Sequence, residues 1–183
     1  MKGMIKKFLC LGVLVCCGTT PTAVRGAPLR DECQPSPNMH ELDSTMIMRQ
    51  PYAPIFGQWY AGEEESRWIG KTASVLLRSG FSSQAALIIE SYIPPEQLSA
   101  TGPVTIKLLI NGQYFDSPVF DTANKYYYKA LLPKALSARA TLCVTLSTDK
   151  NFSPPGDLRE LGLLLQRISV EETKDGIISS LRE

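Results

Sequence analysis

Apolar and polar positions alternate along several short stretches of this chain. In residues 104–110 every second position, from Val104 to Ile110, is a large aliphatic residue, and Asn111-Gly112 follows at once. An alternating run that ends in Asn-Gly is the strongest short signal for a β-hairpin, so we expect residues 113–117 to form the return strand. Residues 141–146 alternate in the same way.

Further strand-like runs bring the expected total to about eight, separated by turn clusters rich in Gly, Pro and Ser. These runs are residues 58–60, 74–78, 86–92, 125–132 and 163–170. No helix-period segment of useful length interrupts them. We therefore predict an all-β fold, a single antiparallel β-sandwich of the jelly-roll or carbohydrate-binding-module kind.

The chain of 183 residues divides into four parts. Residues 1–26 have a basic start, a short apolar run and small residues before Ala27, which is the pattern of a secretory signal peptide cleaved after Gly26 or, as second choice, Ala23. Residues 27–55 are polar and Pro-rich and predict a flexible tail, with a helical turn or two around residues 39–49. Residues 56–172 form the sandwich domain, and residues 173–183 a polar C-terminal tail.

The apolar run near the N-terminus is too short to span a membrane, which needs about 20 residues. The mature chain is thus expected to be exported, to the periplasm or the extracellular space. A lipid anchor at Cys16 or Cys17 is the alternative, although the bulky residues before both cysteines fit a lipoprotein signal poorly.

Charge argues against two classes of partner. The whole chain has 19 basic and 18 acidic residues, and removal of residues 1–26 deletes four basic ones, which leaves 15 against 18, or −3. A weakly acidic chain without a basic block is a poor candidate for binding nucleic acid or an anionic membrane.

Two of the five cysteines, Cys33 and Cys143, lie beyond the predicted signal peptide. In an oxidising compartment they can form a disulfide that ties the N-terminal tail to the sheet. Alternatively, Cys143 is a small strand residue and Cys33 an exposed thiol. Two cysteines and a single histidine do not make a zinc site, so we expect neither metal nor cofactor.

The first cluster that can carry chemistry is an aromatic and charged run at residues 57–68. Its candidate ligand-binding residues are Trp59, Glu65, Arg67 and Trp68. Indole rings can stack on sugar rings while carboxylates accept hydroxyl hydrogen bonds. The alternative is that both tryptophans fill the core and that Arg67 is paired with an acid.

A second cluster, residues 151–162, is a turn rich in Pro and Gly that leads into the last strand. Asp157 and Arg159 are expected to fix this loop by bonding backbone groups and each other. A role of Asp157 or Glu160 in binding calcium or a ligand hydroxyl is the alternative.

The third candidate is Tyr127, in the run Tyr126-Tyr127-Tyr128. Neighbouring strand residues face opposite sides, so at least one of these rings is expected to face solvent, where a sugar or a protein partner can use it. An ordinary half-buried strand explains the same residues.

Hydrolytic chemistry has little support in the sequence. The single histidine, His40, lies in the predicted tail, so a Ser-His-Asp site would depend on a disordered base. A carboxylate pair, one of Glu63 to Glu65 with Asp157, is conceivable for a glycosidase.

The two charged clusters resemble the opening and closing motifs of β-sandwich modules that are appended to bacterial glycosyltransferases and occur in exported bacterial proteins of unknown function. The opening motif is Phe56 to Tyr60 with Glu64, Glu65, Arg67 and Trp68, and the closing one is residues 152–162. The resemblance covers residues 56–172 and implies a non-catalytic, carbohydrate-associated domain.

Three functions follow as hypotheses. The first is an exported β-sandwich without catalysis that binds glycan or acts as an adaptor in the bacterial cell envelope. The second is a protein-interaction or structural module of the envelope, and the third is a small polysaccharide hydrolase.

Overall fold

The computed structural model describes residues 33, 42–48 and 54–173. The predicted signal peptide with Cys16 and Cys17, His40, most of the predicted tail and residues 174–183 lie outside this range. Within it the chain forms ten strands and two short helices. They are β1 (Thr45–Ile47), β2 (Ile55–Glu63), β3 (Ser66–Arg78), β4 (Ala85–Tyr92), α1 (Pro95–Thr101), β5 (Val104–Ile110), β6 (Gln113–Asp116), β7 (Val119–Phe120), β8 (Lys125–Leu131), α2 (Lys134–Ser137), β9 (Thr141–Thr148) and β10 (Leu163–Glu172).

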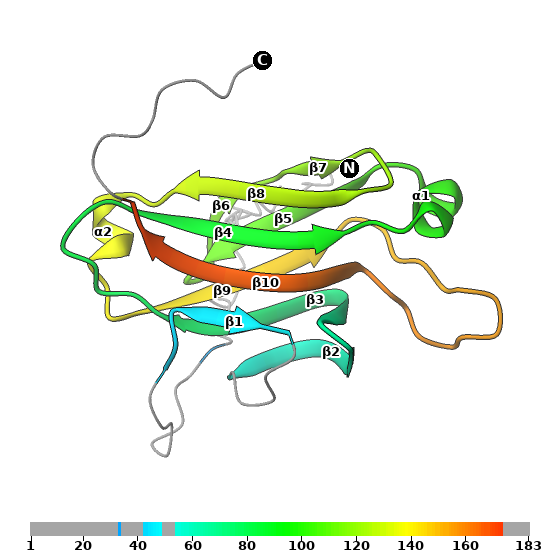
Figure 1. Cartoon of the computed structure of the whole chain (residues 1–183), viewed down its shortest axis with the longest axis horizontal. Helices are drawn as coiled ribbons and strands as arrows, with labels where there is room; N and C mark the ends of the chain where they lie inside the picture. Colours follow the sequence, from blue (N-terminus) through cyan, green and yellow to red (C-terminus); the bar gives the residue numbers. More distant parts are fainter. Residues whose placement is uncertain (1–32, 34–41, 49–53, 174–183) are drawn as a thin grey trace, which may run out of the picture.

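All strand pairs are antiparallel, and the sheet curls into two layers (Figure 1). The front layer in Figure 1 holds β1, β10, β4 and β8, and the layer behind it holds β9, β5, β6 and β7. The predicted all-β sandwich is confirmed.

Strand β3 belongs to both layers. Its residues 67–69 pair with β10, whereas residues 72–78 pair with β9, so the partner changes at Gly70. A strand that bends and switches sheets makes a corner of a sandwich. Strand β2 runs along the other edge of β3 and pairs with residues 66–75.

The core lies between the layers and draws one face from each strand. In β9 the inward residues are Leu142, Val144 and Leu146, and in β4 they are Ala85, Leu87 and Ile89, all at most 2% exposed. Period-two alternation places these residues on one side of each strand. Burial of each large aliphatic side chain contributes about 1.5–3 kcal/mol relative to leaving it in water.

The Asn-Gly hairpin forms as the sequence predicts. Asn111 and Gly112 both have positive φ, 51° and 76°, and join β5 to β6. A two-residue turn with two positive φ angles matches the right-handed twist of the strands.

Strand β1 lies inside the region expected to be a flexible tail, where the sequence analysis placed a helical turn. The structure has a strand instead, with Met46 opposite Ile168 of β10. Met46 and Met48 alternate with the exposed Ile47 and are both buried in the core. The period-two pattern therefore outweighs the Pro-rich composition around it, because pairing with β10 satisfies the backbone.

The structure joins Cys33 and Cys143 by a disulfide across 110 positions of sequence. The bridge packs with Leu76, Leu42 and Phe56 in a small second cluster on the outside of β3 and β9. Of the two alternatives for these cysteines, the structure contains the bridge from tail to sheet.

Candidate functional site

The closing loop, residues 149–162, folds back onto β2. The hydroxyl of Tyr60 donates a hydrogen bond to the carbonyl oxygen of Glu160 (3.1 Å) and accepts one from the Glu160 backbone N–H (3.2 Å). The guanidinium carbon of Arg159 lies 5.7 Å from the centre of the Tyr60 ring. The opening and closing motifs of the sequence thus meet in space, which sequence spacing alone did not predict.

Asp157 and Arg159 bond within this loop. The Arg159 guanidinium donates to both carboxylate oxygens of Asp157 at 2.6–3.1 Å, and the Arg159 backbone N–H donates to the same carboxylate at 2.9 Å. The side-chain bonds from Arg159, followed by its backbone N–H, lower the pKa of the Asp157 carboxyl. These contacts belong to the loop itself, as the structural interpretation of this pair expects. Leu158, between them, is fully exposed.

Trp59 is directed toward the core. Its ring is partly buried against the main hydrophobic cluster. The indole N–H donates to the backbone carbonyls of Phe56 (2.9 Å) and Ser74 (3.2 Å). Both the ring face and the polar edge of Trp59 are therefore engaged inside the protein, as the core interpretation of this residue expects.

Glu65 and Arg67 lie at the hairpin between β2 and β3. Glu65 is exposed, and Arg67 is half-buried with its Nε atom fully enclosed and without a hydrogen-bond partner. Among the described residues Arg67 forms no ion pair with an acid. The pairing that the core interpretation attached to Arg67 is therefore not found there.

Trp68 points away from the core, on the outer side of the front layer. It is 6% exposed and lies directly opposite Leu164 of β10, which in turn lies opposite Tyr92 of β4. Directly opposite residues of an antiparallel pair share a face, so these three side chains share the outer face.

Tyr127 lies on the same face, at the sheet edge. The residue is 62% exposed and stands directly opposite Glu90. The Glu90 carboxylate accepts a hydrogen bond of 3.0 Å from Arg167, and Arg167 also binds Glu171. An aromatic ring open to solvent is thus adjacent to a fixed pair of carboxylate and guanidinium.

A bulge in β10 places Arg167 there. Leu165 lies opposite Ser91 and Arg167 opposite Glu90, so Gln166 is an extra residue in β10. Leu163 and Leu165 face the core before the bulge, and Ile168 and Val170 face it afterwards. Without the extra residue, Arg167 would point into the core, because a one-residue slip reverses every side chain.

We call this surface the aromatic face. It consists of Trp68, Leu164, Arg167, Glu171, Glu90, Tyr92, Lys125, Tyr127 and Lys129. Of the ligand-binding candidates from the sequence, Trp68 and Tyr127 lie on this face, on strands β3 and β8, whereas Trp59 faces the core. The polar members of the face were not among the residues predicted from the sequence. The apolar residues of β10 occupy odd-numbered positions at Leu163 and Leu165 and even-numbered positions at Ile168 and Val170. This shift by one position is the sequence signal that Arg167 points outward.

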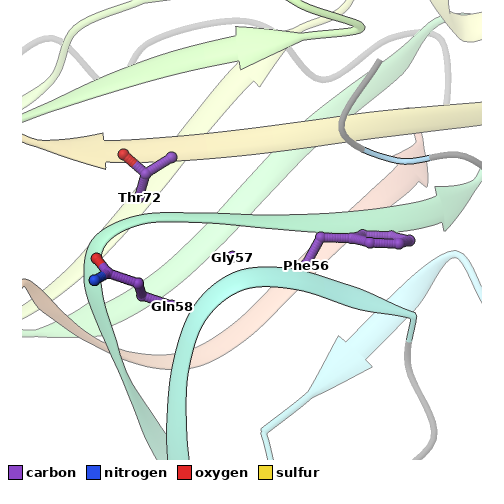
Figure 2. Close-up of a pocket in the computed structure, with 4 residues that line it drawn as sticks. All are labelled: Phe56, Gly57, Gln58 and Thr72. Atoms are coloured by element: carbon purple, nitrogen blue, oxygen red, sulfur yellow. The ribbon is translucent and has the colours of Figure 1, made fainter. Parts of the chain in front are cut away.

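The hollow drawn in Figure 2 lies elsewhere, over β2 and β3. It has a volume of about 420 Å³ and is lined by Phe56, Gly57, Gln58 and Thr72. The side-chain amide oxygen of Gln58 (Oε1) accepts a hydrogen bond of 2.8 Å from the Lys71 backbone N–H. None of the lining residues is titratable, so the hollow offers no acid or base.

Two further properties concern the described part of the chain. It contains no group of three or more His, Cys, Asp or Glu side chains able to hold a metal ion. None of its helices is long and apolar enough to cross a membrane.

No protein-family model and no curated protein matches this chain. A family 35 carbohydrate-binding module from Clostridium thermocellum has a similar structure, with 14% identity and a TM-score of 0.43 over 71% of this chain and 99% of that one. A family 35 module from an environmental isolate gives 14% identity and a TM-score of 0.45, over 72% and 93% of the two chains.

The GH115 4-O-methyl-α-glucuronidase BtGH115A gives 11% identity and a TM-score of 0.45 over 78% of this chain, which spans 19% of that enzyme. All three TM-scores lie below 0.5. The resemblance to modules beside bacterial glycosyltransferases stays a prediction.

Proposed function

We propose that this chain is a non-catalytic module that binds glycan through the aromatic face and acts in the bacterial cell envelope after export. The observation that carries the proposal is Tyr127, 62% exposed and directly opposite a Glu90 carboxylate that Arg167 holds in place. Trp68, Glu65 and Arg67 were candidates for the same role. Of these, Trp68 lies on the aromatic face, where it is buried.

The chemistry of the face suits a sugar. The apolar side of a pyranose ring can stack on an exposed tyrosine ring, while its hydroxyls need fixed hydrogen-bond acceptors and donors. Glu90 supplies acceptors and Arg167 supplies donors, and their mutual bond restricts both side chains before a ligand arrives. Groups that are already ordered lose less entropy on binding.

A binding role suits these carboxylates better than hydrolysis. A glycosidase acid needs a raised pKa and a second carboxylate across the bond that is cleaved. Glu90 and Glu171 both bind the Arg167 guanidinium, so the two carboxylates lie on one cation and not on opposite sides of a bond to be cleaved. Asp157, a member of the carboxylate pair that the sequence suggested for a glycosidase, has a lowered pKa and is held by Arg159.

Two observations support export. The N-terminal 26 residues have the pattern of a signal peptide. The disulfide between Cys33 and Cys143 belongs to proteins of oxidising compartments.

Binding to a glycan array tests the proposal, with Tyr127→Ala as variant and Tyr114→Ala as matched control. Tyr114 is 64% exposed, but it lies on β6 in the other layer. We expect Tyr127→Ala to weaken retention about tenfold while the control binds as the parent does. A well-folded protein that binds no glycan on the array, or equal losses in both variants, would contradict the proposal.

A second candidate function rests on Leu158. This fully exposed leucine sits between Asp157 and Arg159, whose mutual bonds fix the loop. A rigid loop that presents an apolar side chain suits a protein contact in the envelope. Capture of one protein partner that is lost in Leu158→Ser, together with a silent glycan array, would favour this function over the first.

A further inference from the structure

The charges around Tyr127 are not balanced. Lys125, Tyr127 and Lys129 occupy alternate positions of β8, so all three project from the same face of the strand. All three are exposed. The two lysines are four positions apart on the strand, or about 13 Å, with Tyr127 midway between them.

The carboxylates of the aromatic face do not compensate these lysines. Glu90 binds Arg167, and Glu171 binds both Arg167 and Ser169. In the described part of the chain neither Lys125 nor Lys129 takes part in an ion pair. Three cations and two carboxylates therefore leave the face positive, although the chain beyond residue 26 carries −3 by sequence.

We infer that the ligand is an anionic glycan, a polymer that carries carboxylates on its sugar rings, and that it runs along β8. A ring would stack on Tyr127 while carboxylates on its neighbours approach Lys125 and Lys129. This inference rests on the proposed function, because it assigns the substrate class of the same face. Positive side chains on both sides of an exposed aromatic ring favour negatively charged sugars over neutral ones.

Lys125 and Lys129 act here as point charges. Both are exposed, so each contributes modestly and salt screens the contribution. The lysines therefore select among glycans, and ring stacking on Tyr127 supplies affinity for any glycan that fits. This division of roles allows the two proposals to fail separately.

The test measures the affinity of the full mature protein for polygalacturonate, alginate and hyaluronan, and for the same polymers after carboxyl reduction. We expect carboxyl reduction to weaken binding to at least one of them about tenfold, and Lys125→Gln with Lys129→Gln to produce a similar loss. Lys71→Gln with Lys107→Gln is the control, because these lysines are also exposed but lie outside the aromatic face. The affinity should fall between about 50 and about 300 mM NaCl, and less so in the Lys125 and Lys129 variant.

Several outcomes would overturn the inference. Equal affinity for the carboxylated and reduced polymers that still depends on Tyr127 would leave the glycan function intact and refute the anionic class. Equal binding of poly-glutamate would mean that any polyanion suffices. Absence of binding to every polymer, charged or neutral, would refute both the inference and the proposed function.

Discussion

Gly162 lies against the backbone carbonyl of Gly70, at the point where β3 changes from one layer to the other. A Cβ on Gly162 would stand 2.9 Å from Cγ2 and Oγ1 of Thr148 and nearer still to the carbonyl oxygen of Gly70. The backbone N–H of Gly162 donates to the Ile69 carbonyl at 2.7 Å, and its own carbonyl accepts from the buried Gln97 amide at 2.6 Å. Close backbone approach at the corner therefore requires a residue without a side chain.

Gly162→Ala is the first prediction. The methyl group meets backbone on one side and a buried threonine on the other, so the corner must shift, and we expect the free energy of unfolding to fall by about 1–3 kcal/mol. Urea denaturation measures the change. Gly62→Ala is the control, because its Cβ would meet other atoms only at 3.5 Å or more, an ordinary contact. Equal stability of the Gly162→Ala variant and its parent would refute the close approach.

The fold was predictable mainly where one residue type decides the local structure. Asn111-Gly112 defines the hairpin by its positive φ angles, and alternation defines β5 and β9. Strand β3 was predicted only over residues 74–78, because its first half begins with polar residues whose strand character depends on pairing with β10. Strand β1, which lies in the predicted tail, was not predicted for the same reason: it forms by pairing with β10.

The candidate site was less predictable, because its members come from four strands. The exposure of a tyrosine in the run around Tyr127 follows from strand alternation alone. The position of Glu90 next to Tyr127 depends on the register between β4 and β8, and the outward direction of Arg167 depends on the bulge at Gln166. Trp59 and Trp68 lie in similar aromatic and charged sequence surroundings. Trp59 faces the core and Trp68 lies on the outer face, and the sequence alone does not show this difference.

Trp59→Phe is predicted to affect stability and leave binding unchanged. Phenylalanine keeps most of the ring packing but removes the N–H donor to the Phe56 and Ser74 carbonyls, which should cost about 1–2 kcal/mol. Trp59→Ala should cost about 3 kcal/mol or more, because it also leaves a cavity. Denaturant unfolding checks both values. If folded Trp59→Phe lost binding while its stability was unchanged, Trp59 would be a ligand-binding residue and not a core residue.

The disulfide between Cys33 and Cys143 closes a loop of about 110 residues. In the chain-entropy account such a bridge stabilises by about 4–5 kcal/mol through the unfolded state, so Cys33→Ser with Cys143→Ser should lower the free energy of unfolding by several kcal/mol. Thiol titration of the protein purified without reductant, before and after reduction, measures how much of the bridge is present in the starting material. Identical denaturation midpoints for the oxidised and reduced protein would contradict its stabilising role.

Tyr128 provides a prediction on pH. Its hydroxyl donates to the Asp116 carboxylate at 2.7 Å, and burial, followed by this hydrogen bond, raises the pKa of the Tyr128 hydroxyl well above its usual value. The folded state therefore favours the neutral phenol. The corresponding stability is complete below the unfolded pKa of about 10 and is lost as the pH rises above it. Tyr128→Phe should lose about 1–2 kcal/mol at neutral pH through the missing hydrogen bond.

Above pH of about 10 the parent should lose stability more steeply than Tyr128→Phe, because only the parent must ionise this phenol on unfolding. Urea denaturation from neutral pH to about pH 11 measures both slopes. Tyr114→Phe is the control, because the Tyr114 side chain is exposed to solvent. Parallel slopes in the parent and in Tyr128→Phe would mean that the phenol is as accessible to ionisation in the folded protein as in the unfolded chain.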